Sequence, residues 1–444
     1  METINRRDFI GKAIIAGAGL ALTPHLSFAD FASKKARIAF IGVGLRGTNH
    51  LSNMLHRKDV EIPAICDIDP VRIGIAQDLI AKAGFKKAAV YSKNEHSFLD
   101  LLKRDDIDGV IISTPWEWHT PMAVAAMKAG KYAGVEVSAA NTVEECWDLV
   151  NTSEKTGSHC MILENVCYRR DVMAVLNMVR QNLFGELTHC QCGYQHDLRG
   201  VKFEPGAEFG EKGIHEAHWR TEHSVKRNGD LYPTHGIGPI ANCLNINRGN
   251  SFVSLTSVAT KSRGLHNYII DKGGKDHPNA NVKFKLGDIV STLIQTSNGE
   301  TILVTHDTNS PRPYSLGFRV QGTKGLWMDD GNVIYIEGKS KNDEWESATK
   351  YLEQYDHPLW KRYADDANGA GHGGMDFFVL NAFVESVKRK VAPPLDVYDA
   401  AAWSVISPLS EMSIANGGAP QQFPDFTRGK WKDRKPVFGF TNEY

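Results

Sequence analysis

Three glycines, Gly42, Gly44 and Gly47, form the pattern G-x-G-x-x-G directly after a short apolar segment. In this pattern the first glycine permits a tight turn, the second lets a pyrophosphate approach the backbone, and the third lets a helix pack closely on a strand. The backbone amides of Leu45 and Arg46 would then face phosphate oxygens from the N-terminus of a helix. The sequence therefore predicts that this turn binds the pyrophosphate of a dinucleotide.

Asp67 follows the next apolar segment, about twenty residues beyond the last glycine. A carboxylate there accepts hydrogen bonds from the adenosine ribose hydroxyls and repels a 2′-phosphate, which favours NAD over NADP as the cofactor. Polar and aromatic residues also follow three further predicted strands, and ligands of open parallel sheets bind at such strand ends. We therefore expect further cofactor contacts from Trp116, Glu117, Trp118, His119, Glu136, Val137 and Asn165.

Histidine and tyrosine residues in the second half of the chain are candidates for proton transfer. Histidine ionises near neutral pH, which suits His235 to this work. Tyr232 lies three residues earlier, on the same face if the segment is helical. A tyrosine is a poor base unless a positive charge lowers its pKa, and Arg220 or a nicotinamide ring could supply that charge. The run His215-Glu216-Ala217-His218 lacks the zinc-binding spacing His-Glu-x-x-His, so no metal site is expected.

The elements that position the cofactor residues alternate between strand and helix through residues 30–165. This alternation predicts a Rossmann domain with a doubly wound parallel sheet. Thr142 and Glu145 form a capping-box pattern at the start of one helix, which Gly157 ends. The expected strands are residues 37–41, 61–66, 88–91, 109–113, 132–137 and 160–163, and the other expected helices are residues 48–55, 70–83 and 121–129.

Residues 166–444 are expected to form a second, α+β domain with a mostly antiparallel open sheet, on which the substrate binds. The segment Thr296-Ser297-Asn298-Gly299 between two strand-like runs is a hairpin signal. We expect the late helices to pack back on the Rossmann domain. The expected strands are residues 187–194, 251–259, 288–296, 300–307, 317–322 and 325–330, and the expected helices are residues 171–182, 375–391 and 398–415.

Composition limits the class of protein that these 444 residues represent. The chain is 42% hydrophobic and 23% charged, as in ordinary globular proteins, and its length suggests about two domains. A net charge of −1 gives no reason to expect nucleic acid or an anionic membrane as a partner. The seven cysteines follow no disulfide or metal pattern and are predicted to be buried free thiols.

Residues 1–29 have the features of a twin-arginine signal peptide. Arg6 and Arg7 precede an apolar run at residues 13–22, and Ser27-Phe28-Ala29 is a small-x-small cleavage site. The run is too short to span a bilayer, so stable membrane insertion is not expected. We expect the twin-arginine export machinery to carry the folded protein to the periplasm or beyond. NAD loaded before export would remain bound and would not be consumed.

The order of these motifs resembles the glucose–fructose oxidoreductase and inositol dehydrogenase family over nearly the whole chain after the signal peptide. Within that family the sequence is most similar to glycoside hydrolase family 109, the NAD-dependent α-N-acetylgalactosaminidases. The similarity is carried by Thr114-Pro115-Trp116-Glu117-Trp118-His119-Thr120-Pro121, Gly134-Val135-Glu136-Val137-Ser138, Leu163-Glu164-Asn165-Val166-Cys167-Tyr168, His218-Trp219-Arg220, Leu231-Tyr232-Pro233-Thr234-His235-Gly236 and Pro311-Arg312-Pro313-Tyr314.

The resemblance implies a sugar substrate, free or at a glycan terminus, surrounded by Tyr194, Arg220, Tyr232, His235 and Tyr314. It implies proton transfer by His235 and Tyr232. Arg220 and Tyr194 would position sugar hydroxyls or the acetamido carbonyl, and Tyr314 would line the pocket. The resemblance also suggests a homo-oligomer that forms through the open sheet face.

Two departures from the wider family bear on the reaction. Its dehydrogenases usually carry Glu-Lys-Pro where this chain has Glu136-Val137-Ser138, and the missing lysine takes the proton from the alcohol that is oxidised. They also place an aspartate four residues before the site histidine, where this chain has Leu231. These departures favour the hydrolase subgroup.

The resemblance implies hydrolysis of terminal α-N-acetylgalactosamine with no net redox change. Hydride passes from carbon 3 of the sugar to NAD, which acidifies the proton on carbon 2. A base removes that proton, the group on carbon 1 is eliminated, water adds, and the hydride returns. The alternatives are a net NAD-dependent sugar or polyol dehydrogenase and a non-catalytic sugar-binding protein.

Overall fold

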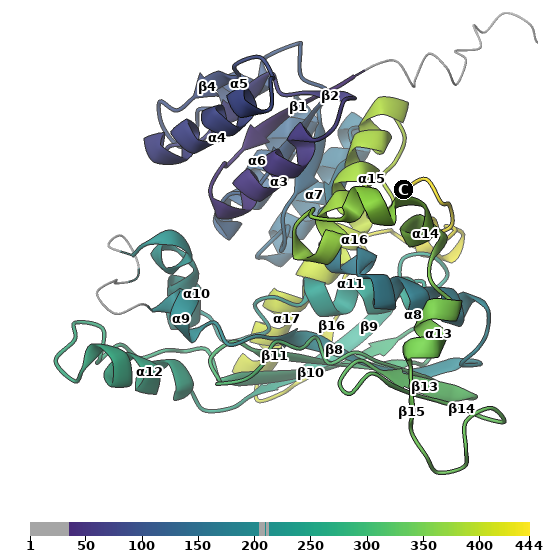
Figure 1. Ribbon diagram of the computed structural model, residues 1–444. Coiled ribbons are helices and arrows are strands. Elements are labelled where there is room, and N and C mark those ends of the chain that lie inside the picture. The colour runs from purple at the N-terminus through teal and green to yellow at the C-terminus, as the bar shows by residue number, and fades with distance from the viewer. Residues whose placement is uncertain (1–34, 204–208, 210–212) are drawn as a thin grey trace, which may run out of the picture.

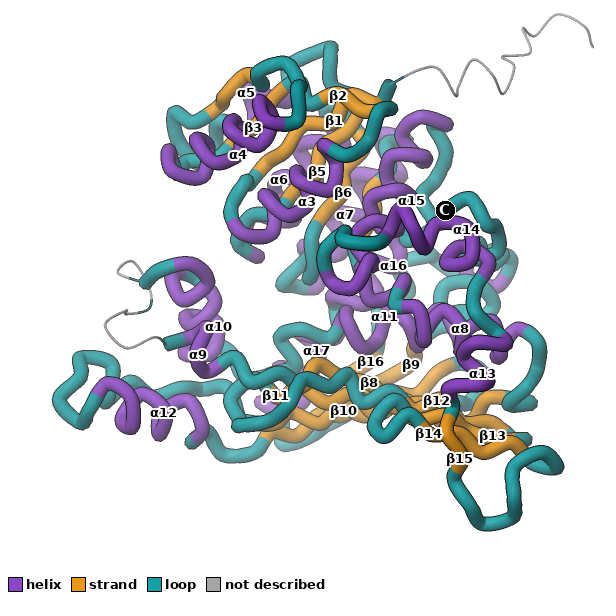
Figure 2. Tube along the Cα trace, in the orientation of Figure 1, coloured by secondary structure: helices purple, strands orange, loops and turns teal. Residues whose placement is uncertain are grey.

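Two β-sheets organise the protein, whose computed structural model describes residues 35–203, 209 and 213–444 (Figure 1). The expected signal peptide lies outside the described residues. Figure 2 shows one sheet within the N-terminal half and a second, larger sheet at the opposite end of the molecule, with helices α8 (Arg170–Arg180) and α11 (Thr234–Cys243) between them. No helix in the described ranges is long and apolar enough to cross a membrane.

The first sheet is parallel throughout and has the strand order β4-β3-β1-β5-β6-β7, with β2 paired to β1. The expected doubly wound parallel sheet is therefore confirmed. Its strands are β1 (Ala36–Ile41), β2 (Val60–Glu61), β3 (Ala64–Cys66), β4 (Ala89–Tyr91), β5 (Gly109–Ile112), β6 (Tyr132–Val135) and β7 (Cys160–Ile162). The helices that connect them are α3 (Leu45–Leu55), α4 (Pro70–Lys82), α5 (Phe98–Leu102), α6 (Trp116–Lys128) and α7 (Val143–Thr156).

Proline accounts for two wrong boundaries in this half. The expected strand at residues 61–66 is two strands, β2 and β3, because Pro63 between them has no N–H to donate to a neighbouring strand. Helix α6 begins at Trp116, directly after Pro115, and Pro121 lies inside it instead of at its start. Helix α3 also begins earlier than expected, at Leu45 within the glycine turn.

Half of the expected capping box is present at α7. The Thr142 hydroxyl accepts the backbone N–H of Glu145 at 3.1 Å, as expected. The Glu145 carboxylate accepts the N–H of Asn141 at 2.6 Å instead of the N–H of Thr142. Gly157 ends the helix in a left-handed conformation with φ of 70°, which a glycine adopts without strain.

The second sheet has nine strands in the order β15-β14-β13-β12-β8-β11-β10-β9-β16. Every neighbouring pair is antiparallel except β8 and β11, which are parallel. The expected hairpin joins β10 and β11 and is confirmed. The strands are β8 (Leu187–Gln195), β9 (Phe252–Ala259), β10 (Ile289–Thr296), β11 (Thr301–Asp307), β12 (Arg319–Gly322), β13 (Gly325–Met328), β14 (Val333–Ile336), β15 (Glu346–Ser347) and β16 (Gln421–Gln422).

Most helices of the second half are short and were not expected. The expected helix at residues 398–415 is two helices, because Pro408 has no N–H for the carbonyl of Ser404. Besides α8 and α11 the helices are α9 (Arg199–Lys202), α10 (Arg220–Lys226), α12 (Gly264–Gly273), α13 (Thr349–Gln354), α14 (Pro358–Ala367), α15 (Met375–Arg389), α16 (Val397–Ser404) and α17 (Ile406–Ala415). Short 3₁₀ helices include η1 (Asn165–Tyr168), η3 (His215–His218) and η4 (His372–Gly374).

Close contacts through glycine join the two halves. The Phe383 ring of α15 lies against Gly109 and Gly134 of the first sheet, where a Cβ would come within 3.2 and 3.0 Å of the ring. In the first turn of α11, a Cβ on Gly236 would lie 2.6 Å from the backbone nitrogen of Gly193 in β8. Further along the same helix, a Cβ on Gly238 would lie 3.1 Å from Cγ of Glu164, so α11 also lies against the end of β7. All seven cysteines are buried free thiols, as predicted.

Candidate active site

The glycine turn between β1 and α3 has a backbone geometry that side chains would prevent. Gly42 has φ of +86°, and a Cβ there would lie 2.6 Å from the carbonyl oxygen of Ser113. A Cβ on Gly47 would lie 2.1 Å from the carbonyl oxygen of Gly42. Both distances are far below van der Waals contact, so the turn requires glycine at these positions. It leads directly into α3, whose first residues, Leu45 and Arg46, carry amides without intrahelical partners.

The space beside this turn fits a dinucleotide. A Cβ on Gly44 would meet no atom within 4 Å, so the backbone there borders open space. Buried polar atoms without a hydrogen-bond partner follow three neighbouring strands, β5, β6 and β7; they are Ser113 Oγ, Ser138 Oγ, Glu164 Oε2 and Asn165 Oδ1. Buried polar atoms normally have partners, and a dinucleotide at the strand ends would supply them. The residues present therefore fit NAD.

Asp67 is held beside the turn by backbone amides. Its Oδ2 accepts the N–H of Val43 at 2.7 Å, and its Oδ1 accepts the N–H of Asp69 at 2.9 Å. The carboxylate is fixed at the end of β3 and keeps lone pairs for further donors. This geometry agrees with the predicted contact to ribose hydroxyls.

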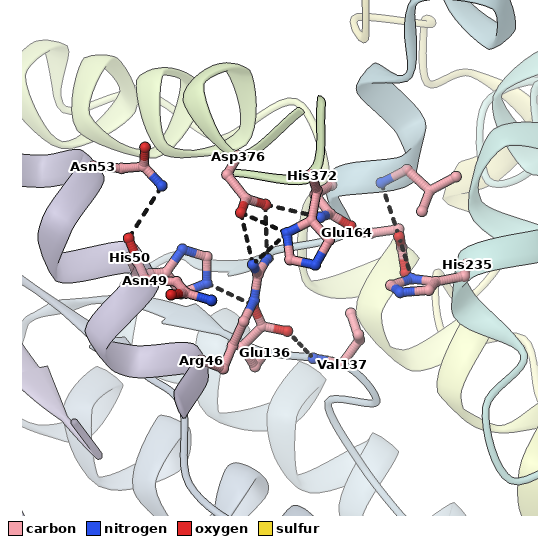
Figure 3. Close-up of polar contacts among 12 residues, drawn as sticks. Arg46, Asn49, His50, Asn53, Glu136, Val137, Glu164, His235, His372 and Asp376 are labelled. Carbon is pink, nitrogen blue, oxygen red and sulfur yellow. Dashed lines mark hydrogen bonds and ion pairs between the residues drawn. The ribbon is translucent and has the colours of Figure 1, made fainter. Parts of the chain in front are cut away.

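Both carboxylate oxygens of Glu136 bind other groups of the protein. Its Oε1 lies 2.6 Å from Arg46 Nε and 2.6 Å from His50 Nε2, and its Oε2 accepts the N–H of Val137 at 3.1 Å (Figure 3). Burial opposes ionisation, but Arg46 and His50 hold the pKa of Glu136 well below its usual range. Glu136 is therefore a charged anchor for the wall of the crevice, and its own contact to NAD stays a prediction.

Two of the expected cofactor residues pack against the protein itself. The ring nitrogens of His119 lie 2.7 and 2.8 Å from the carbonyl oxygens of Ser138 and Thr114, so the ring ties the ends of β5 and β6 together. Both ring nitrogens face protein carbonyl oxygens, and a contact from His119 to the cofactor stays a prediction. Trp118 packs edge-on against Phe98, with ring centroids 6.4 Å apart. Contacts from Trp118 and from Glu117, which is mostly exposed, stay predictions.

The residues expected around the sugar form one aromatic cluster. The Tyr194 ring lies 4.6 Å from Tyr232, 5.4 Å from His235 and 6.2 Å from Tyr314, measured between centroids. Tyr232 precedes α11 and is not helical, whereas His235 lies in the first turn, yet their rings are 4.9 Å apart. Trp116 stacks on Tyr232 at 5.7 Å and so links the strand ends of the first sheet to this cluster.

Arg220 is a largely buried cation that lies against these rings. Its guanidinium lies 5.0 Å from the Trp116 ring, 5.4 Å from Trp219 and 5.3 Å from Tyr232, and its Nε is 2.6 Å from a Glu216 carboxylate oxygen. A guanidinium fixed in this way can donate to planar or anionic oxygen acceptors. Sequence reasoning identified Arg220 but missed Glu216, its charge partner four residues earlier.

Glu164 orients His235. The His235 Nδ1 lies 2.7 Å from Glu164 Oε1, which also accepts the N–H of Val166, and the Glu164 side chain is completely buried (Figure 3). Donation from Nδ1 to the carboxylate leaves Nε2 as the basic nitrogen. Sequence reasoning placed Glu164 at a strand end but did not pair it with His235. Its position directly after an apolar strand was the available signal.

The surroundings of Tyr232 oppose its ionisation. Burial and the neighbouring Tyr194 raise the pKa of Tyr232 well above its usual value, and Arg220 offsets only part of this shift. The Tyr232 hydroxyl is therefore protonated at neutral pH. Among the protein's own groups it suits the role of a donor, and His235 suits the role of the base.

The fold and the site define a protein with an NAD-binding Rossmann domain. Residues 36–163 match the family model "Oxidoreductase family, NAD-binding Rossmann fold". Levoglucosan dehydrogenase in complex with NADH has a similar fold, with a TM-score of 0.65 and 19% identity, over 88% of this chain and 100% of that chain. An inositol dehydrogenase homologue from Azotobacter vinelandii, with NADH and myo-inositol, has a TM-score of 0.65 and 18% identity, over 88% and 98% of the chains.

The second half narrows this class to one family. Residues 168–433 match the model of the glycosyl hydrolase 109 C-terminal domain. An α-N-acetylgalactosaminidase of Tannerella forsythia is 55% identical over 462 residues, which cover 98% of this chain and 99% of that protein. A glycosyl hydrolase family 109 protein of Stenotrophomonas maltophilia strain K279a is 54% identical over 456 residues, with 100% of each chain covered. The chain belongs to glycosyl hydrolase family 109, and NAD is its cofactor.

Replacing Gly44 by alanine is expected to weaken NAD binding without disturbing the fold, because the new Cβ enters the open space beside the turn. We expect the Kd for NAD to rise at least about tenfold, equivalent to about 1.4 kcal/mol, with the melting temperature unchanged. Calorimetric titration and thermal unfolding measure the two quantities. In the matched variant Gly47→Ala the Cβ meets backbone, so stability should fall as well. Native NAD affinity in Gly44→Ala would show that the cofactor does not occupy this space.

The Glu164→Gln variant keeps the size of the side chain and removes the charge that orients His235. We expect the hydrolytic kcat to fall about 10²-fold, in the range that general acid–base groups contribute, while NAD content and melting temperature stay close to native. Steady-state kinetics of the NAD-loaded protein measure this. The exposed residue Glu144 on α7 provides the matched control, Glu144→Gln, with native kcat. A kcat within twofold of native in Glu164→Gln contradicts the orienting role.

Proposed function

We propose that the protein hydrolyses terminal α-linked N-acetylgalactosamine, with NAD held at the glycine turn and no net redox change. The observation that carries the proposal is the His235–Glu164 pair, at 2.7 Å, within the cluster of Tyr194, Tyr232 and Arg220. The relative from Tannerella forsythia, named as an α-N-acetylgalactosaminidase, supports this substrate class because its similarity extends over nearly the whole chain.

The side chains divide the proton and binding steps between them. NAD, when bound, would supply a hydride acceptor and donor for carbon 3 of the sugar. The proton of the carbon 3 hydroxyl passes to solvent in this oxidation, and the ketone that forms acidifies the proton on carbon 2. His235 removes that proton through Nε2, because its Nδ1 donates to Glu164. Tyr232, which stays protonated, donates to an oxygen of the sugar or of the leaving group. Arg220 and Tyr194 hold hydroxyls or the acetamido carbonyl, and Tyr314, about half exposed, lines the outer side.

A net dehydrogenase is not favoured. Where the related dehydrogenases carry a lysine, this chain has Val137, and where they carry an aspartate it has Leu231; both side chains are buried and apolar. Neither side chain can take the proton of an alcohol, so the oxidation at carbon 3 in the proposed reaction releases its hydroxyl proton to solvent. The similarity to a relative named as an α-N-acetylgalactosaminidase favours hydrolysis over net oxidation. The Glu164–His235 pair is suited to removing a proton from carbon 2 of the sugar. Proton removal from carbon is a step of elimination.

Incubation of the purified protein with an aryl α-N-acetylgalactosaminide and no added NAD tests the proposal. We expect release of the aryl alcohol without a rise in NADH absorbance, and a loss of about 10²–10⁴-fold in kcat for His235→Ala. Steady NADH production on added NAD would favour the dehydrogenase instead. Neither signal, with NAD still bound, would favour a non-catalytic sugar-binding protein.

We also propose that the twin-arginine machinery exports the folded, NAD-loaded protein to the periplasm or beyond. Arg6 and Arg7, the apolar run after them and the small-x-small site at Ser27-Phe28-Ala29 support this. A variant with lysine at both positions 6 and 7 is expected to remain in the cytoplasm, as measured by cell fractionation with an antibody. Native export of that variant would count against this route.

The homo-oligomer expected from the resemblance stays a prediction. Val258 of β9 and Leu293 of β10 are 58% and 50% exposed on neighbouring strands of the second sheet. A second copy of the chain would cover such side chains.

A further inference from the structure

An ion network joins the glycine turn to the C-terminal helix α15, and no step of the proposed reaction uses it (Figure 3). Arg46 donates through Nη1 and Nη2 to Oδ2 and Oδ1 of Asp376, at 2.8 and 2.9 Å. The same guanidinium donates through Nε to Glu136 at 2.6 Å. One side chain from the cofactor turn therefore holds both the end of β6 and a helix 330 residues away in the sequence.

Asp376 is the centre of this network. Its side chain is completely buried in the first turn of α15, and its carboxylate also accepts Nδ2–H of Asn165 at 2.8 Å and Nδ1–H of His372 at 2.8 Å. Burial opposes ionisation, but His372 and Arg46 hold the pKa of Asp376 well below its usual range. A buried carboxylate is stable only while it is paired. If the glycine turn separated from α15, the Asp376 carboxylate would lose its ion pair with Arg46. The positions of the turn and of α15 are therefore strongly coupled.

His372 is the exposed member of the network. Its side chain is 51% exposed, and its Nδ1 lies 2.8 Å from Asp376 Oδ2 and 3.2 Å from Arg46 Nη1. The loop around it, residues 368–374, has positive φ at Gly369, His372, Gly373 and Gly374. A loop so rich in glycine has few side chains to hold it in place. His372 is the side chain that attaches this loop to the buried ion pair.

The network and the cofactor site share residues. The backbone of Arg46 belongs to the turn that borders the open space at Gly44. Asn165 binds Asp376 through Nδ2, while its buried Oδ1 has no partner within the protein and lies at the end of β7, where the cofactor binds. Groups that serve both a ligand and an internal contact are thermodynamically linked, so each stabilises the other.

We propose that Arg46, Asp376 and His372 form a latch that retains NAD. In the latched state the loop of residues 368–374 closes the outer side of the cofactor site, and the dinucleotide leaves only after His372 separates from Asp376 and Arg46. The latch would keep NAD bound during the proposed reaction. It rests on the proposed function, because retention is useful only for a cofactor that is restored in each turnover.

The rate of NAD release tests the latch without any sugar. Protein purified with labelled NAD is chased with excess unlabelled NAD, and the label that remains bound is followed with time. We expect His372→Ala to release NAD at least about tenfold faster than the native protein, within the range of typical coupling between sites. His372→Asn should release it at close to the native rate, because the asparagine amide nitrogen takes the place of Nδ1 and still donates to Asp376. His56→Ala, an exposed residue at the far end of α3, is the matched control with native release.

The rates of NAD release in the two His372 variants together test the latch. Faster release in His372→Ala and rescue in His372→Asn, with native melting temperatures, support the latch. Release within twofold of native in His372→Ala overturns it, as does equally fast release in both variants. Because no glycoside is present, failure of the latch leaves the proposed hydrolysis untouched, and absence of hydrolysis in the native protein leaves the release measurement valid.

Discussion

The hydrogen bond between His235 and the buried Glu164 is the interaction on which the rest of the site depends. Glu164 follows directly on β7, so the parallel sheet fixes its position, and His235 lies in the first turn of α11, which packs on β8 through Gly236 and Gly193. The bond therefore joins the cofactor half to the sugar half. A carboxylate without solvent needs such a partner, and the imidazole gains a defined basic nitrogen from it.

The next residue along the chain extends this link to the cofactor. Asn165 binds Asp376. Figure 3 shows the contact between Asp376 and Arg46 of the glycine turn. Adjacent residues therefore connect the catalytic base and the NAD turn. On the other side Trp116 and Arg220 stack against Tyr232. The aromatic cluster therefore lies beside the strand ends of the first sheet, so that a sugar in the cluster and a cofactor at the strand ends would be close, as hydride transfer requires.

Sequence reasoning succeeded where the signal is local or belongs to a long motif. The glycine pattern, Asp67 and the apolar strands are local, and they were sufficient for the parallel sheet and the cofactor. Arg46–Asp376 spans 330 residues and follows no periodicity, so no local pattern could indicate it. The raised pKa of Tyr232 arises from burial, which the spacing to His235 does not reveal. Helices α9 to α14, α11 included, were not expected, because each has ten residues or fewer and such brief patterns are difficult to recognise.

The central claim is that the bound NAD oxidises and then re-reduces the sugar within each turnover. Hydrolysis of an aryl α-N-acetylgalactosaminide in D₂O, followed by proton NMR of the released sugar, tests this claim most directly. Removal of the carbon 2 proton by His235 and its later replacement from solvent predict deuterium at carbon 2, whereas carbon 3 keeps its hydrogen because the hydride returns. Released sugar without deuterium at carbon 2 would contradict the account, because direct displacement at carbon 1 leaves that proton in place.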